Sequence, residues 1–295
     1  MTRATGIGRA GAHHGEILQG VFSVDGRLMR GLVTLPCPLF AVEVSAVLEP
    51  GRRVIEVAPA WKVKARTAAR LTLDAIGLYE TGARLLVDGA IPVCQGYGSS
   101  TSDVVATVRA ICSAVGAQLD ETEVAKLAVR SEIASDPLMF DRAVLFAQRD
   151  GVVLEDFGVH FPPVEVLGFS TTGHKTGVST LEFPPARYST GEAERFEQLR
   201  LHVRDALARG DVSALGLVAS ESTRLNQHHL PVSGLDELIQ IARSVAASGL
   251  QVAHSGDVAG LLFDPRDADV EARLEEAETL LAAAGIADTW RFRSA

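Results

Sequence analysis

Apolar residues recur along the chain with two spacings, and each spacing predicts one kind of element. A spacing of three to four residues predicts helices near 65–76, 104–115, 124–132, 196–206, 212–226, 235–245 and 270–281. Alternating or continuous apolar runs predict strands at 41–48, 53–57, 83–87, 143–148, 152–157, 164–169 and 289–292, and two strand-like pieces within 252–263. The order of strand, turn, strand, helix and strand at the C-terminal end predicts a small α+β lobe.

The segment 91–102, IPVCQGYGSSTS, lies between a predicted strand and a predicted helix. Gly96 and Gly98 permit positive φ and a close approach of backbone amides to a ligand. Hydroxyl residues at 99–101 fall at the helix N-terminus, where free N–H groups and the helix dipole attract anions. Serines and threonines at such positions are otherwise caps, and the glycines before them are turns. The length of the pattern favours a phosphate-binding loop.

Charge and composition narrow the possible partners. Lys and Arg number 28 against 37 Asp and Glu, a net charge of −9, and no basic cluster suits nucleic acid. No apolar run reaches the roughly 18 residues of a membrane span, and the N-terminus lacks a signal-peptide apolar region. The 3 cysteines form no CxxC pair. We therefore expect a cytoplasmic protein without nucleic-acid or membrane partners, and we leave a homodimer open.

The length of 295 residues allows two domains. The sequence FPP at 161–163 has the character of a connector, so we place a boundary near residue 160 and expect domains at 1–160 and 161–295.

Two glycine motifs lack the context that their usual functions need. Residues 6–11 satisfy GxGxxG, but neither the preceding strand nor the following helix of a dinucleotide-binding unit is predicted. Residues 168–176 nearly match a P-loop, yet Pro184 and Pro185 follow where a helix should begin. Neither motif is therefore assigned a nucleotide.

Other polar residues are candidates with structural alternatives. Polar groups crowd the segment 11–20 before a predicted strand, but adjacent histidine side chains diverge, which argues against zinc at His13 and His14. Glu16 could be a surface acid. Asp136 could form a turn before proline, and Asp141 could be a solvated strand end.

Three segments in order, at 11–20, 92–102 and 253–260, resemble the motifs of the GHMP kinases. The central one looks like that family's Pro-x-x-x-Gly-x-Gly-Ser-Ser phosphate loop. Within the family, GEILQG at 15–20, SSTSD at 99–103 and AHSG at 253–256 are most similar to the L-threonine kinases. The resemblance implies a two-lobe GHMP kinase fold, with an N-terminal mixed α/β lobe, a C-terminal ferredoxin-like lobe, and ATP with Mg²⁺ between them.

The resemblance also implies roles for individual residues. Ser100 and Glu132 would hold Mg²⁺, and Asp141 would orient or deprotonate the acceptor hydroxyl, so these three form the expected catalytic set. ATP would be bound by Pro92, Gln95, Gly96, Tyr97, Gly98, Ser99, Ser100, Thr101 and Ser102. The acceptor would be bound by His13, His14, Glu16, Asp136, Lys175, Ser255 and Gly256.

The expected function is ATP-dependent phosphorylation of the hydroxyl of L-threonine or a related hydroxy amino acid. The alternatives are a homoserine or mevalonate-type acceptor, or a noncatalytic metabolite-binding member of the fold. Two departures from relatives fall at the acceptor end: the histidine pair, and the absence of an expected acidic residue in 172–180, where Ser179 stands. The histidine pair and Lys175 lead us to hypothesise a more acidic acceptor.

Overall fold

The computed structural model describes residues 4–93, 95–172, 186–253 and 257–294. The strands are β1 (Thr5–Val24), β2 (Arg27–Pro50), β3 (Ile55–Ala58), β4 (Thr81–Gly89), β5 (Val144–Ala147), β6 (Val152–Asp156), β7 (Val164–Ser170), β8 (Gly249–Val252), β9 (Val258–Phe263) and β10 (Thr289–Ser294). The helices are α1 (Val63–Ala75), α2 (Ser99–Val115), α3 (Glu121–Glu132), α4 (Thr190–Arg209), α5 (Val212–Leu225), α6 (Leu235–Ser244) and α7 (Val270–Ala283).

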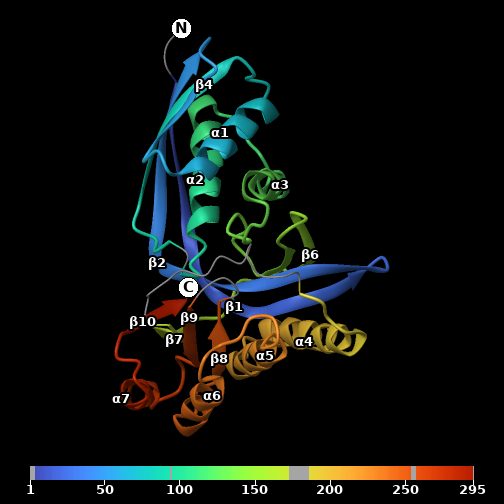
Figure 1. The fold of residues 1–295 in the computed structure, drawn as a ribbon, viewed down its shortest axis with the longest axis vertical. Helices are drawn as coiled ribbons and strands as arrows, with labels where there is room; N and C mark the ends of the chain where they lie inside the picture. Colours follow the sequence, from blue (N-terminus) through green and yellow to red (C-terminus); the bar gives the residue numbers. More distant parts are fainter. Residues whose placement is uncertain (1–3, 94, 173–185, 254–256, 295) are drawn as a thin grey trace.

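These strands form one sheet in the order β10-β7-β9-β8-β1-β2-β4-β3, with β5 and β6 branching from β2. β1 and β2 are long antiparallel partners that bend midway along their length (Figure 1). The first part of β1 pairs with residues 41–47 and the last part with residues 27–33. Register shifts between residues 11 and 18 separate the two parts. Such bulges bend a strand and re-aim its side chains.

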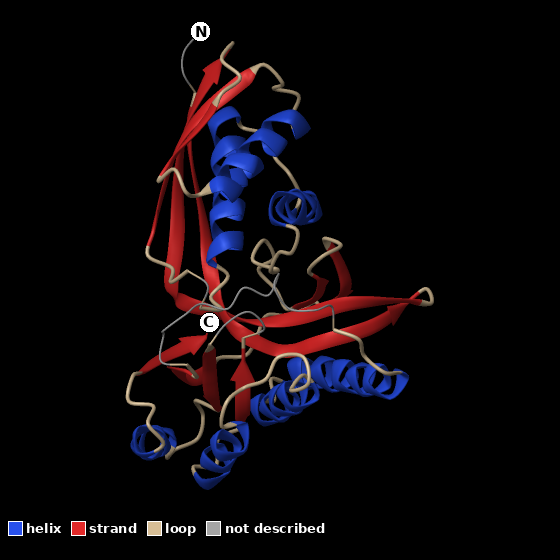
Figure 2. Cartoon of the chain, in the orientation of Figure 1, coloured by secondary structure: helices blue, strands red, loops and turns tan. Residues whose placement is uncertain are grey.

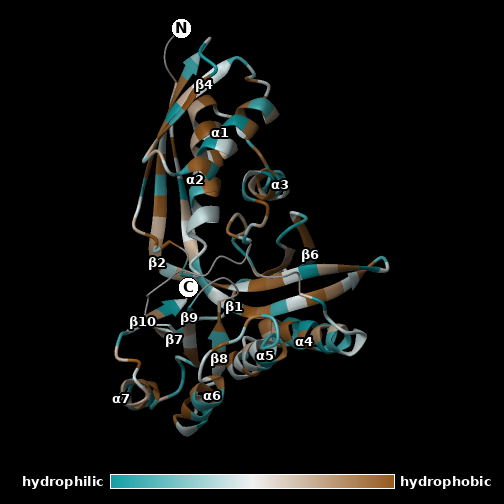
Figure 3. Ribbon diagram, in the orientation of Figure 1, coloured by the Kyte–Doolittle hydropathy of each residue, from teal (hydrophilic) through white to brown (hydrophobic). Residues whose placement is uncertain are grey.

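The helices cover selected faces of this sheet (Figure 2). α1 and α2 lie along one face of the β1–β2–β4–β3 part, while α4 and α5 pack beneath the far end of β1 (Figure 1). Buried side chains of α6 and α7 form a second apolar cluster with β7, β8 and β9. Hydrophobic and hydrophilic residues alternate along the elements, as half-buried strands and helices require (Figure 3). No helix in the described ranges combines the length and apolar character needed to cross a membrane.

The predicted helices and most predicted strands are confirmed with small differences at their ends, but β2 begins at Arg27, well before the strand predicted at 41–48. The first strand is the main exception, because β1 passes straight through the polar segment 11–20 that we expected to precede a strand. Its glycines and bulges interrupt the alternation from which strands are recognised.

Glycines of the GxGxxG segment let α2 lie directly on β1. A Cβ atom at Gly6 would stand 2.3 Å from the Ala110 carbonyl oxygen, and one at Gly8 would stand 2.2 Å from the Ala106 carbonyl oxygen. Contacts this short with backbone cannot be relieved by a side-chain rotation. These glycines therefore serve helix packing, in a strand with no dinucleotide-binding turn.

His14 lies in the core. Its side chain is fully buried, accepts a hydrogen bond at Nδ1 from the Gln251 amide, and packs edge-on against the rings of Tyr97 and Trp290. Burial first, and the neighbouring His13 second, lower the pKa of His14 to about 3. The ring of His14 is therefore enclosed by core side chains and its lowered pKa favours the neutral form, so the structure gives no support to the expected contact of His14 with the acceptor.

Gly8→Ala should lower the free energy of unfolding by about 1–3 kcal/mol, because the added methyl group must push α2 away from β1. Gly11→Ala on the same strand is the matched control, since a Cβ there meets nothing within 4 Å. Urea unfolding of both variants measures the difference. Equal stabilities would contradict the close packing described here.

The buried neutral His14 should make stability depend on pH. The unfolded state binds a proton below its pKa of 6.5 whereas the folded state does so only near 3, so stability falls as pH decreases from 6.5 towards 3. At pH 5 the loss is about 2 kcal/mol. Comparing urea unfolding at pH 7 and pH 5 for the wild type and His14→Asn isolates this contribution. An identical pH dependence in the two proteins would show that His14 is not buried neutral.

Candidate active site

The predicted phosphate loop opens a helix, as expected. Gly96 and Gly98 have φ of 96° and 72°, and Gly98 is the N-cap of α2 without a side-chain cap. The Ser102 hydroxyl bonds the carbonyl oxygen of Gly11 at 2.7 Å and that of Gly98 at 3.0 Å, which ties the loop to β1. The first N–H groups of α2 lack partners within the helix, so the loop can receive an anion.

The hydroxyls at the start of α2 contact a buried carboxylate and do not cap the helix. The Ser100 hydroxyl donates to Glu132 Oε2, and the Thr101 hydroxyl donates to Glu132 Oε1 at 2.7 Å. Burial raises the pKa of Glu132, and its hydrogen bond from Ser100 and the charge of Lys64 oppose that rise. The structure thus brings Ser100 and Glu132 together, and their oxygens are the ligand type that Mg²⁺ prefers.

The position of Glu132 is set by where α3 begins and ends, because Glu132 is the last residue of this helix. A capping box of Asp120 and Glu123 fixes the start of the helix. Its end follows at once after Glu132, because Ile133 adopts a φ of 75° and the chain turns away from the helical path. The turn carries Asp136 back beside Thr101, whose hydroxyl accepts the Asp136 backbone N–H at 3.1 Å.

A second buried polar group joins β1 to this turn. Nε2 of His13 lies 3.2 Å from Asp136 Oδ2, and Nδ1 of His13 lies 3.9 Å from Glu16 Oε1. One ligand atom from each of the three residues lies within 4.8 Å of the others. His13 also adjoins the phosphate loop, since a Cβ at Gly98 would stand 2.5 Å from its Cδ2. The bulges of β1 therefore bring His13 and Glu16 to the start of α2.

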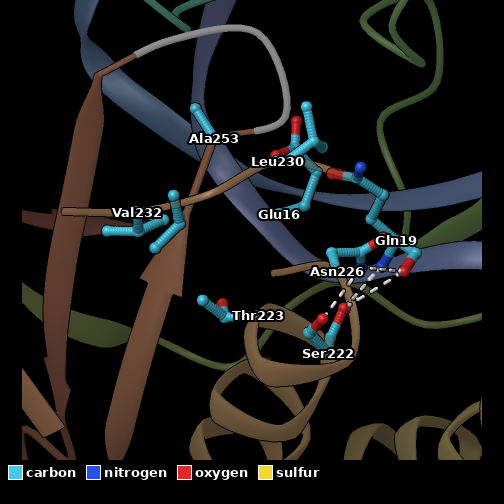
Figure 4. A pocket seen from close by; sticks show the side chains of 9 residues that line it. Glu16, Gln19, Ser222, Thr223, Asn226, Leu230, Val232 and Ala253 are labelled. Atoms are coloured by element: carbon cyan, nitrogen blue, oxygen red, sulfur yellow. Dashed lines mark hydrogen bonds between the residues drawn. The ribbon is translucent and has the colours of Figure 1, made fainter. Parts of the chain in front are cut away.

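A small cavity lies beside Glu16 (Figure 4). Glu16 is the one ionisable side chain among the described residues of its wall, and apolar groups such as Leu230 and Val232 complete it. A backbone group holds one polar side chain of the wall in place, because the Gln19 N–H donates a hydrogen bond to the Ser222 hydroxyl at 3.0 Å. The wall consists of Glu16, Gln19, Ser222, Thr223, Asn226, Leu230, Val232, Val252 and Ala253.

Asp141 does not join either polar group. Its side chain is 78% exposed and its carboxylate lies 3.6 Å from the Arg142 guanidinium. Its backbone carbonyl accepts a hydrogen bond from His160. Asp141 comes just before β5, as a solvated strand end would, and it lines a separate cavity with Gly11, Pro137 and His160.

Other expected site residues are placed less directly. Tyr97 is buried against Phe40 and Trp290, so its side chain belongs to the core and only its backbone is available to a ligand. Pro92 and Gln95 are half-buried, and the Gln95 carbonyl accepts the Val258 N–H at 3.3 Å. Lys175, Ser255 and Gly256 lie outside the described residues.

Two lysines at the start of α1 were missed by the sequence analysis. Lys62 forms a buried ion pair of 2.6 Å with Asp103. Burial raises the pKa of Asp103, and the hydrogen bond and charge of Lys62 oppose that rise. Nζ of Lys64 lies 3.4 Å from Glu132 Oε2. Both lysines precede the apolar residues that predicted the helix at 65–76, and nothing in the sequence indicated a site there, since only the fold brings α1 beside α2 and α3.

The part of the chain that contains the phosphate loop and Glu132 also matches a known protein family. Residues 62–141 match the model of the GHMP kinases N terminal domain. The chain is 30% identical over 192 residues to an L-threonine kinase of Salmonella typhimurium, which covers 65% of this chain and 63% of that protein. It is 28% identical over 189 residues to an L-threonine kinase of Citrobacter freundii, covering 64% and 65%. The chain thus aligns with less than two thirds of the length of either relative.

The fold extends beyond these alignments. A homoserine kinase from Cytophaga hutchinsonii superposes with a TM-score of 0.70 at 16% identity, covering 100% of this chain and 96% of that one. The chain therefore shares the fold of this homoserine kinase, and its residues 62–141 match the model of the GHMP kinases N terminal domain, in agreement with the resemblance expected from its motifs.

Proposed function

We propose that this protein is an ATP-dependent kinase that phosphorylates the hydroxyl of L-threonine or a related hydroxy amino acid. The observation that carries the proposal is the convergence of Ser100, Glu132 and Asp136 at the N-terminus of α2. Phosphoryl transfer needs a phosphate-binding loop, ligands for a divalent cation, and a carboxylate beside the attacking oxygen. The two L-threonine kinase relatives support the choice of acceptor.

The phosphate loop would bind the nucleotide phosphates through backbone N–H groups of residues 98–101. Ser100 and Glu132 would hold Mg²⁺, because a hydroxyl and a carboxylate already meet there. The metal would supply neutralisation of the charge that develops on the phosphoryl oxygens. In this arrangement the buried Glu132 exchanges its hydroxyl contacts for a cation.

Asp136 is the residue that we assign to the acceptor hydroxyl. Its Oδ2 lies 3.3 Å from the Thr101 hydroxyl and 3.2 Å from His13 Nε2, so it is fixed beside the phosphate loop. There it would accept the proton of the acceptor hydroxyl while the acceptor oxygen attacks the terminal phosphorus. His13 would hold the carboxylate in place. This assignment replaces Asp141, whose carboxylate is exposed.

The charge of the cavity bears on the acceptor. Glu16 contributes a carboxylate to the described part of the wall, and no lysine or arginine stands beside it there. A carboxylate pairs with an ammonium group and repels an anion. This favours an acceptor with an amino group, which suits a hydroxy amino acid and disfavours mevalonate. The hypothesis of a more acidic acceptor loses one of its supports, because His14 is neutral and buried.

The fold similarity to a homoserine kinase favours homoserine as the second candidate acceptor. Homoserine and L-threonine both carry an ammonium group and a hydroxyl, and they differ in where the hydroxyl is attached. We also retain the proposal of two domains, at 1–160 and 161–295, with the boundary just before β7.

An ATP-consumption assay with a panel of acceptors tests the function. L-threonine should give turnover at least tenfold faster than mevalonate, because only the amino acid can pair with Glu16. Homoserine, L-serine and a reaction without acceptor complete the panel. Absence of acceptor-dependent ADP formation across the panel would favour a noncatalytic metabolite-binding protein.

The two aspartates give a matched pair of variants. Asp136→Asn should lower kcat by about 10²-fold or more and leave ATP affinity nearly unchanged, since it removes the proposed proton acceptor. Asp141→Asn should keep kcat within about twofold, because its side chain is exposed. Steady-state kinetics with direct nucleotide titration separates the two effects. The reverse ranking would return the catalytic role to Asp141.

A further inference from the structure

Lys64 reaches the carboxylate to which we assign the metal. It lies in the first turn of α1, and its Nζ is 3.4 Å from Glu132 Oε2, the same oxygen that the Ser100 hydroxyl contacts. The side chain of Glu132 is 1% exposed, whereas that of Lys64 is 43% exposed. The ammonium group therefore stands at the edge of the site, with its stem open to solvent.

Lys62 and Lys64 differ in how firmly they are held. Lys62 is 9% exposed and bonds the equally buried Asp103 at 2.6 Å, so moving it would leave a buried carboxylate without its cation. The contact of Lys64 with Glu132 is longer, and the Lys64 side chain is 43% exposed, so its ammonium group can leave Glu132 when another cation takes its place there. Lys62 is a fixed part of the fold.

The negative charges around the start of α2 offer Lys64 a second partner besides Glu132. Three carboxylates surround the start of α2, those of Asp103, Glu132 and Asp136, and ATP would add further negative charge beside them. A divalent cation on Glu132 would neutralise the charge that now attracts the ammonium group. Asp103, which Lys64 also influences, already pairs with Lys62, so the phosphate chain of a nucleotide bound at the start of α2 would be the anion left for Lys64. A lysine has a flexible four-carbon stem that suits such a change of partner.

We propose that Lys64 is a phosphate-contacting catalytic residue, which pairs with Glu132 when the metal is absent and binds the transferring phosphoryl group when the nucleotide is bound. This rests on the proposed kinase function. The ammonium group would stabilise negative charge on the phosphoryl oxygens as the bond to ADP breaks and the bond to the acceptor oxygen forms. Lys64 gives no proton in this step and remains an ammonium.

The test compares Lys64→Met, which keeps the length of the side chain without its charge, with Lys64→Arg and with Lys126→Met. Lys126 is an exposed lysine of α3 and serves as the matched control. Lys64→Met should lower kcat by about 10²-fold and raise the Kd of Mg·ATP, measured by calorimetry, by about tenfold. Lys64→Arg should recover part of both losses, and Lys126→Met should stay within about twofold of the wild type. Thermal unfolding confirms that each variant is folded.

Two results would overturn the proposal. One is an unchanged Kd and kcat in Lys64→Met. The other is full recovery of Lys64→Met at high Mg²⁺ concentration, since Lys64 would then act only by holding Glu132. The calorimetric arm separates this proposal from the kinase function. Weaker Mg·ATP binding by Lys64→Met, in a protein that turns over no acceptor, would support Lys64 while rejecting the proposed reaction.

Discussion

The contact on which the site depends is the seating of the α2 N-terminus against the bulged part of β1. Ser102 ties the first turn to the Gly11 carbonyl, and Gly98 leaves room for the His13 ring. Farther along, Gly6 and Gly8 bring the helix backbone against the strand. A helix fixed at this distance presents its free N–H groups beside the side chains that β1 supplies. The packing of α2 on β1 thus positions both the phosphate loop and the side chains proposed to face the acceptor.

Around that support the structure collects more charge than a buried region usually holds. Glu132, Asp136 and Asp103 are all largely buried, and each is compensated differently: by hydroxyls and a lysine, by a histidine, and by a fixed lysine. Buried carboxylates of this kind need such partners because desolvation disfavours their charged form. Buried carboxylates can bind a cation, and the lysines beside them can bind a polyanion, so this arrangement suits a site that receives both together.

Local sequence patterns predicted the start of α2, most elements, and the residues of the phosphate loop, since these depend on spacing and glycine conformation. They did not predict that β1 continues through residues 11–20, because bulges erase the alternation of a strand. Adjacent histidines could not be assigned from sequence either. The bulged path of β1 sends His14 into the aromatic core and His13 to Asp136. The resemblance gave the catalytic role to Asp141 and acceptor binding to Asp136, and only the turn after α3 reveals that the side chain of Asp136 is largely buried and that of Asp141 exposed.

Among the described residues, β1 and β8 are joined by a single register pair, Glu16 with Val252. β2 and the side branch β5 also share one pair, Leu32 with Phe146, whereas the other neighbouring strands along the main order of the sheet are joined by runs of several pairs. The backbone connection between the two parts of the sheet is therefore narrowest at Glu16, a residue that also lines the cavity. Because Glu16 and Val252 both line this cavity, any shift of one part of the sheet against the other would change the width of the cavity. The Gln95 carbonyl, which accepts the Val258 N–H, would pass the same shift on to the phosphate loop.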